Sequence, residues 1–106
     1  MAENEYGARL DRNGYAESIL QKAECCFRCG RTTEKLDRNE IFGGVDRNKS
    51  KRYGLWVLMC HEPCHSIFHS EAEYRRRLRA YAQGCAELEY GWSKETFIRM
   101  FGKSYK

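Results

Sequence analysis

The residues with the clearest capacity for chemistry lie in one stretch, Cys60 to His69, which reads C-H-E-P-C-H-S-I-F-H. It holds two of the six cysteines, all three histidines and the single proline of the chain. Proline is well tolerated in the first turn of a helix, so we expect a helix to begin near Glu62 and Pro63. His65 and His69 then lie one turn apart on one helical face, the spacing of a metal-binding pair.

A second cysteine pair precedes this stretch by about thirty residues. Cys26-x2-Cys29-Gly30 has the form of a zinc knuckle, in which two thiolates meet at one ion and the glycine allows a tight turn. Cysteines of a chain in a reducing compartment favour metal ligation over disulfides. We therefore predict a closed, structural zinc site with four thiolate ligands, namely Cys26, Cys29, Cys60 and Cys64.

Two refinements of this site stay open. The Cys60-x3-Cys64 spacing is one residue longer than the commonest pair, so His61 could replace one thiolate. Cys25 is a competitor for Cys26. A redox switch that uses Cys25, Cys26 and Cys29 is a weaker third reading, because the zinc site already accounts for four cysteines.

The composition limits the class of protein. The chain has 106 residues, 42% hydrophobic residues and a formal net charge of +4, which indicates one folded domain and permits nucleic-acid binding. No apolar run has the length of a membrane span, and the first twenty residues lack the apolar core of a secretion signal. We expect a cytoplasmic protein with no membrane partner.

The elements that must position the metal ligands are a hairpin and several helices. Residues 35–42 and 55–59 are predicted strands, joined by a polar and basic loop over residues 45–53. The two strands are expected to form a hairpin, and Cys60 follows directly after its second strand. Residues 15–22 have the spacing of a short amphipathic helix.

Two further helices are expected after His69. Ser70 to Glu73 has the form of a capping box, and Gly91 is expected to end the helix that it opens. The last helix is expected between Ser93 and Gly102. The first of these helices carries an apolar seam at alternating steps of four and three residues, consisting of Tyr74, Leu78, Tyr81, Cys85 and Leu88.

This order of elements predicts an α+β fold with a treble-clef, or ββα-metal, core. A knuckle, a short hairpin and a helix whose first turn supplies the last thiolate surround one zinc ion. An N-terminal helix and two C-terminal helices are expected to flank the core. The prediction is a single domain over residues 1–106, with the core at about 24–70 and the helical extension at 71–106.

Here the chain resembles the zinc-knuckle form of the HNH, or ββα-metal, endonuclease family, especially its small phage-borne members. The resemblance covers about residues 24–69 and rests on C-x2-C, the strand L-D-R-N-E with I-F-G-G, C-H-x2-C-H and H-x3-H. It extends weakly to F-I-x2-F-G-x3-Y over residues 97–105. It implies hydrolysis of DNA phosphodiester bonds with Mg²⁺, Mn²⁺ or Ni²⁺ bound by His65 and His69, with Asp37 as the natural third ligand.

Asn39 departs from this family pattern, because the relatives carry a histidine on the strand at that position. An asparagine amide cannot accept a proton at neutral pH, and a lost general base costs about 10²–10⁴ in rate. Glu40 is the neighbouring candidate base, but successive strand residues point to opposite faces. The catalytic candidates are therefore Asn39, Glu40, His65 and His69, in a nuclease that is either weakened by nature or deliberately inactivated.

Basic residues flank the expected site and are candidates for phosphate contacts. They occupy the loop and the start of the long helix, as Arg47, Lys49, Lys51, Arg52, Arg75, Arg76, Arg77 and Arg79. They support the alternative function of an inactive zinc module that binds DNA or a protein partner, for example a phage-encoded inhibitor of a host defence protein. The expected location is the cytoplasm of a bacterial or phage-infected cell.

Overall fold

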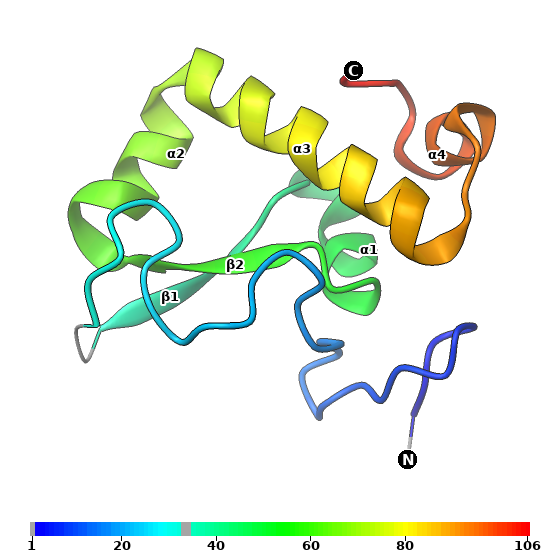
Figure 1. Ribbon diagram of the computed structural model, residues 1–106, viewed down its shortest axis with the longest axis horizontal. Coiled ribbons are helices and arrows are strands. Elements are labelled where there is room, and N and C mark those ends of the chain that lie inside the picture. The colour runs from blue at the N-terminus through cyan, green and yellow to red at the C-terminus, as the bar shows by residue number, and fades with distance from the viewer. Residues whose placement is uncertain (1, 33–34) are drawn as a thin grey trace.

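The computed structural model describes residues 2–32 and 35–106 (Figure 1). Over these residues it has an α+β fold, the predicted class, with a two-stranded antiparallel sheet and four α-helices. The elements in chain order are β1 (Leu36–Glu40), the 3-10 helix η1 (Gly44–Asp46), α1 (Arg47–Arg52), β2 (Trp56–Cys60), the π-helical turn η2 (His61–His65), α2 (Ser66–Ser70), α3 (Ala72–Tyr90) and α4 (Lys94–Phe101).

The sheet register decides which side chains of β1 can approach the metal ligands. Asp37 pairs with Met59, and Asn39 pairs with Val57. Because side chains alternate along a strand, these four residues share one face, and Glu40 lies on the other. Leu36 pairs with Cys60, so the start of β1 lies beside the end of β2, where η2 begins.

The predicted helix over residues 15–22 is wrong, and no helix occurs within residues 2–32. Two amides of residues 15–22 bond instead to carbonyls at the end of α1 and in the turn between α1 and β2. The Ala16 amide donates to the Lys51 carbonyl, and the Ile19 amide donates to the Gly54 carbonyl, both at 2.9 Å. Gly54 permits the close approach, because a Cβ there would lie 2.3 Å from the backbone oxygen of Glu17.

The predicted loop over residues 45–53 is also wrong, because α1 occupies most of it. Its lysine and arginine residues have good helix propensity, which their polarity concealed. Ser50 fixes the helix to the end of the first strand. Its buried hydroxyl donates to the Phe42 carbonyl at 2.8 Å and accepts from the Phe42 amide at 3.0 Å.

The ends of the last two helices follow the sequence signals more closely. Gly91 ends α3 with a φ of +68°, and the Ser93 hydroxyl caps α4 by accepting from the Thr96 amide at 3.0 Å. The capping box expected at Ser70–Glu73 does not form, because no side chain caps α3 and its N-cap residue is Glu71.

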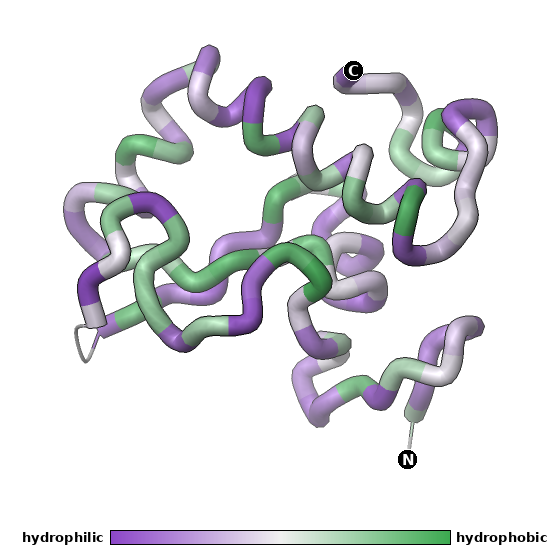
Figure 2. The backbone as a smooth tube through the Cα atoms, in the orientation of Figure 1, coloured by the Kyte–Doolittle hydropathy of each residue, from purple (hydrophilic) through white to green (hydrophobic). Residues whose placement is uncertain are grey.

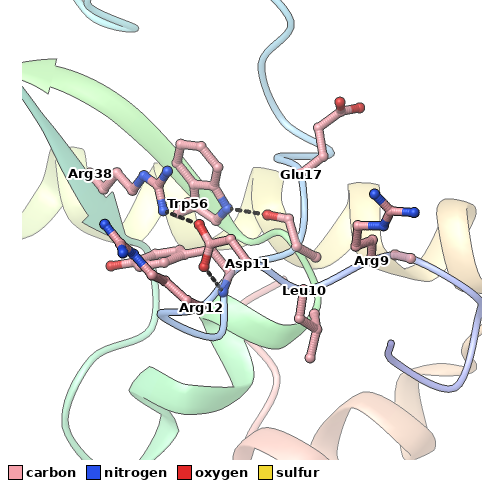
Figure 3. Close-up of a pocket in the computed structure, with 10 residues that line it drawn as sticks. Arg9, Leu10, Asp11, Arg12, Glu17, Arg38 and Trp56 are labelled. Carbon is pink, nitrogen blue, oxygen red and sulfur yellow. Dashed lines mark hydrogen bonds and ion pairs between the residues drawn. The ribbon is translucent and has the colours of Figure 1, made fainter. Parts of the chain in front are cut away.

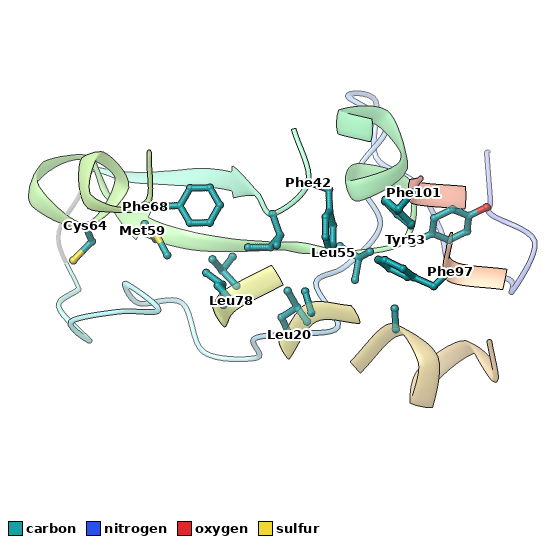
Figure 4. Packing of buried hydrophobic residues seen from close by; sticks show 14 of the residues in the cluster. Leu20, Phe42, Tyr53, Leu55, Met59, Cys64, Phe68, Leu78, Phe97 and Phe101 are labelled. Carbon is teal, nitrogen blue, oxygen red and sulfur yellow. The ribbon is translucent and has the colours of Figure 1, made fainter. Parts of the chain in front are cut away.

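The hydrophobic core lies between the sheet and the two C-terminal helices (Figure 4). Phe42 meets Phe97 and Phe101 at centroid distances of 5.6 and 4.9 Å. Figure 2 shows the hydrophobic stretch of β2 and the hydrophilic start of α3. The buried face of α3 is formed by Leu78, Ala82, Gln83 and Ala86.

The predicted apolar seam of α3 is therefore only partly internal. Leu78 is buried, but Tyr81 is 51% exposed and Leu88 is 88% exposed. The small side chains of Ala82 and Ala86 allow α3 to approach the core instead. In the described part of the chain, no helix is both long and apolar enough to span a membrane.

Candidate metal centres

Four cysteines meet where the knuckle approaches the end of β2. The sulfurs of Cys26, Cys29, Cys60 and Cys64 all lie within 4.8 Å of one another, and those of Cys29 and Cys60 are 4.0 Å apart. Tetrahedral zinc with Zn–S bonds of about 2.3 Å places its sulfurs about 3.8 Å apart. The cluster can therefore hold a metal ion such as zinc, and its ligand set is the one predicted from spacing.

Backbone hydrogen bonds give the knuckle its shape and fix it to the sheet. The Gly30 amide donates to the Cys26 carbonyl at 2.8 Å, with Gly30 at a φ of +80°. The Cys29 amide points at the Cys26 sulfur at 3.5 Å. The Phe27 amide donates to the Leu58 carbonyl at 2.7 Å, which holds the knuckle against β2.

The thiols of the cluster differ in how easily they ionise. Burial opposes the charge on Cys26, but backbone N–H groups, chiefly that of Cys29, outweigh it and lower the pKa of Cys26 to about 6. Burial raises the pKa of Cys64 to about 12, although the Arg28 guanidinium, 3.6 Å from its sulfur, opposes this. Because metal ions deprotonate the thiols that they bind, a divalent cation would favour thiolates at both positions.

The two alternatives for the sulfur site are placed elsewhere. Cys25 is outside the cluster, and its carbonyl accepts a hydrogen bond from the Gln21 side chain at 2.5 Å. His61 is directed at Asp37, with its Nδ1 atom 2.8 Å from the Asp37 Oδ2 atom. None of the six cysteines forms a disulfide.

A second group of potential ligands lies beside the sulfurs, on β1 and η2. The Oδ2 atom of Asp37 is 2.8 Å from Nδ1 of His61 and 2.8 Å from Nδ1 of His65. Hydrogen bonds from His65 and then His61 hold the pKa of Asp37 below its ordinary value of 3.8. Ligand atoms about 2.0–2.2 Å from one metal ion stand about 3 Å apart, so these three groups also fit a shared cation.

The place of His61 in this group was not predicted. The regular helical backbone begins at Pro63, as its residue type suggests, but Glu62 before it is extended, with φ −136° and ψ 133°. The resulting turn brings His61 to the same carboxylate as His65. The repeated Cys-His pair in C-H-x2-C-H was the only sequence signal for this arrangement.

His69 lies next to this group but does not belong to it. Its ring centroid is 4.9 Å from that of His65. Burial lowers the pKa of His69, and the charges of His65, Arg75 and Arg79 lower it further. The structure therefore joins Asp37 to His61 and His65 and leaves His69 as a neighbour in a positive environment.

The two strand candidates for catalysis point to opposite faces of the sheet. Asn39 is 2% exposed, and its amide donates to the Met59 sulfur at 3.5 Å. Glu40 accepts a hydrogen bond from the Tyr15 hydroxyl and forms an ion pair with Arg47 at 2.9 Å. Neither side chain is joined to the Asp37 group, and Glu40 is held by the N-terminal segment and α1.

The basic residues of α3 fall into two sets. Arg75 donates to the carbonyl oxygens of Phe68 and His69, and Arg79 donates to that of Ile41, so both support the backbone near the histidines. Arg76 and Arg77 are exposed and form ion pairs with Glu73.

The basic residues around α1 are also engaged in local contacts. Arg47 pairs with Glu40, and Lys49 with Asp46 at 3.6 Å. Arg52 pairs with Glu5 at 2.7 Å. Lys51 lies 4.8 Å from the centre of the Tyr15 ring.

A surface pocket of about 770 Å³ lies between the N-terminal segment and the sheet (Figure 3). In it, the Arg38 guanidinium lies over the rings of Tyr15 and Trp56, at 4.4 and 5.0 Å, and pairs with Asp11 at 2.9 Å. No cysteine or histidine lines this pocket, so it is separate from both groups of potential metal ligands.

Comparisons of the chain with protein-family models, with curated proteins and with solved structures found no match. The functional argument therefore rests on the geometry of the two ligand groups.

Proposed function

We propose that this protein is a zinc-stabilised, HNH-type DNA endonuclease of weak activity, built on a treble-clef core. One observation carries the proposal: the Asp37 carboxylate lies 2.8 Å from both His61 and His65, directly beside a cluster of four cysteines. A closed sulfur site suits a structural zinc ion, whereas an N,N,O set leaves coordination positions for water or substrate.

In this proposal, Asp37, His61 and His65 hold a divalent cation such as Mg²⁺, Mn²⁺ or Ni²⁺. The ion supplies stabilisation of the negative charge that develops on the scissile phosphate. In the same proposal His69, which is close to the charges of Arg75 and Arg79, contacts that phosphate. The family resemblance suggests a different ligand set, with His69 in place of His61. Comparison of His61→Ala with His69→Ala distinguishes the two sets, because only the variant that removes a ligand should lose the metal.

The activity is expected to be weak because the chain has no proton acceptor at the strand position of the relatives. Asn39 is buried against Met59, and its amide cannot activate water. Loss of a general base costs about 10²–10⁴ in rate, so slow nicking is the expected wild-type behaviour.

Plasmid nicking with Mg²⁺, Mn²⁺ or Ni²⁺ tests this proposal. Asp37→Ala should abolish nicking, whereas Asp11→Ala, which removes a carboxylate from the separate pocket, should not. Asn39→His should increase the rate about 10²-fold by restoring a base. The endonuclease proposal fails if wild type and Asn39→His are both inert on plasmid and single-stranded DNA with all three metals.

The burial of Asn39 favours a second candidate function, a zinc module that binds DNA without cutting it. Such binding should weaken steeply with salt, and removing a phosphate-contacting arginine such as Arg76 should reduce the salt slope by about one. Binding to a protein, such as a host defence protein, is the reading that remains if DNA affinity is absent.

A further inference from the structure

The four sulfurs of the cysteine cluster are not equally accessible to reagents in solution. Cys29 is exposed, whereas Cys26, Cys60 and Cys64 are buried. Zinc keeps the cysteines that it binds deprotonated, and a thiolate that reaches solvent is the form of cysteine that oxidants attack. Cys29 is therefore the position at which a small oxidant can reach the cluster.

The three buried sulfurs differ in how readily they can react with Cys29. The Cys29 amide points at the Cys26 sulfur at 3.5 Å, and the Arg28 guanidinium lies 3.6 Å from the Cys64 sulfur. A hydrogen bond withdraws charge from a thiolate and makes it a weaker nucleophile. The Cys60 sulfur instead faces the Cys29 sulfur at 4.0 Å. The reactive pair is therefore Cys29 and Cys60.

We propose that Cys29 is a modification site for hydrogen peroxide, and that its oxidation links it to Cys60 and releases zinc. The Cys29 thiolate attacks one peroxide oxygen, so that an S–O bond forms, the O–O bond breaks and hydroxide leaves. The Cys60 thiolate then attacks the Cys29 sulfur, so that an S–S bond forms, the S–O bond breaks and a second hydroxide leaves. The two sulfurs give up two electrons, which reduce one peroxide to two hydroxide ions. Only two thiolate ligands then remain for zinc, which needs four ligands in a closed site.

The redox switch considered from the sequence stays within the knuckle. The structure instead places Cys25 outside the cluster and directs Cys29 across to the end of β2. Because Cys60 ends β2 and precedes the turn that carries His61 and His65, oxidation would loosen both groups of metal ligands. The inference rests on the zinc-bound cluster of the proposed function, but not on its nuclease activity.

Treatment of the zinc-loaded full chain with one molar equivalent of hydrogen peroxide tests the proposal. A zinc-sensitive dye follows release of the ion, and mass spectrometry of alkylated peptides maps the disulfide. The expected result is loss of the zinc, a link between Cys29 and Cys60, and a fall in free thiols from six to four. A thiol reductant with added zinc should restore the starting protein.

Two variants identify the sulfur that peroxide reaches first. Cys29→His keeps a zinc ligand at this position but removes the exposed thiolate, so zinc release should slow by about tenfold or more. Cys25→Ser is the matched control, because Cys25 lies outside the cluster, and it should release zinc at the wild-type rate. If Cys29→His does not bind zinc, the disulfide map of the wild-type chain decides.

Failure of this inference differs from failure of the zinc site. A wild-type chain that holds zinc and keeps it in peroxide overturns the inference alone. So does a disulfide map in which Cys29 is not joined to Cys60, or an equal rate of release from wild type and Cys29→His. A chain that binds no zinc before peroxide is added overturns the zinc site of the proposed function as well.

Discussion

The two hydrogen bonds of Asp37 differ in solvent exposure, so their separate contributions to the free energy of unfolding can be predicted. Its carboxylate accepts from two imidazoles at equal distances of 2.8 Å, but the side chain of His65 is 24% exposed and that of His61 is 62% exposed. Hydrogen bonds to charged groups contribute about 1.5–3 kcal/mol when shielded, and exposed ion pairs contribute about 0–1 kcal/mol. We therefore expect about 1–1.5 kcal/mol for the His65 contact and about 0.5 kcal/mol for the His61 contact.

Double-mutant cycles measure these two contacts separately. Asp37→Ala would be combined with His65→Ala and with His61→Ala, and the free energy of unfolding measured by urea denaturation of protein with zinc bound at the four cysteines and no free divalent cation in the buffer. Asp37→Ala alone removes both contacts, about 1.5–2 kcal/mol in total, and should lower the melting temperature by roughly 6–16 °C, at about 4–8 °C per kcal/mol for a domain of this size.

The pH dependence of the free energy of unfolding gives an independent check. The folded-state pKa of Asp37 is lowered, so the stability that it contributes is present above pH 3.8 and is lost as the pH falls through the lower folded value. Asp37→Ala should flatten this acid limb. The reasoning is refuted if the coupling of Asp37 to His65 is smaller than its coupling to His61, or if the acid limb keeps its full slope without Asp37.

Three further predictions concern zinc, backbone and tyrosines. A chelator should abolish cooperative unfolding and expose four extra reactive thiols in a thiol assay, because metal binding in small zinc domains is coupled to folding; unchanged thiol counts would contradict this. Gly54→Ala should destabilise by about 2–4 kcal/mol, since the position combines a φ of +71° with a backbone oxygen 2.3 Å from the added Cβ. Gly43→Ala meets nothing within 4 Å, so equal losses in urea melts of the two variants would contradict this prediction. Burial raises the pKa of three tyrosines to about 12, so the stability they contribute is fully present below pH 10.0 and is lost as the pH rises toward 12. An absorbance titration should show their late ionisation, and titration of every tyrosine near pH 10.0 in the folded protein would refute the burial of Tyr15, Tyr53 and Tyr90.

The sequence alone predicted the parts of the site that depend on the local spacing of residues. The cysteine pairs at residues 26–29 and 60–64 identified the sulfur cluster, and strand alternation placed Asp37 on the face away from Glu40. Gly91 and Ser93 marked a helix end and a helix start through their backbone and hydroxyl chemistry.

The sequence could not show features that depend on distant partners. Residues 15–22 have helical spacing, but the amides of Ala16 and Ile19 bond to carbonyls 35 residues away, which no local pattern reveals. His61 joins Asp37 because the backbone at Glu62 is extended. The apolar seam on α3 is only partly buried, because the alternation of four and three residues does not show which of its side chains face the core.

The turn from Cys60 to His65 interleaves two kinds of ligand, since sulfur and imidazole alternate as Cys60, His61, Cys64 and His65. The two ligand groups therefore share one stretch of backbone, and disorder in that stretch would disrupt both. If the cysteines of this turn were not held together, the histidines between them would not be held in place either. Scarcity of the ion at the sulfurs would thus silence any activity of the histidines, which makes the supply of that metal a built-in condition for function.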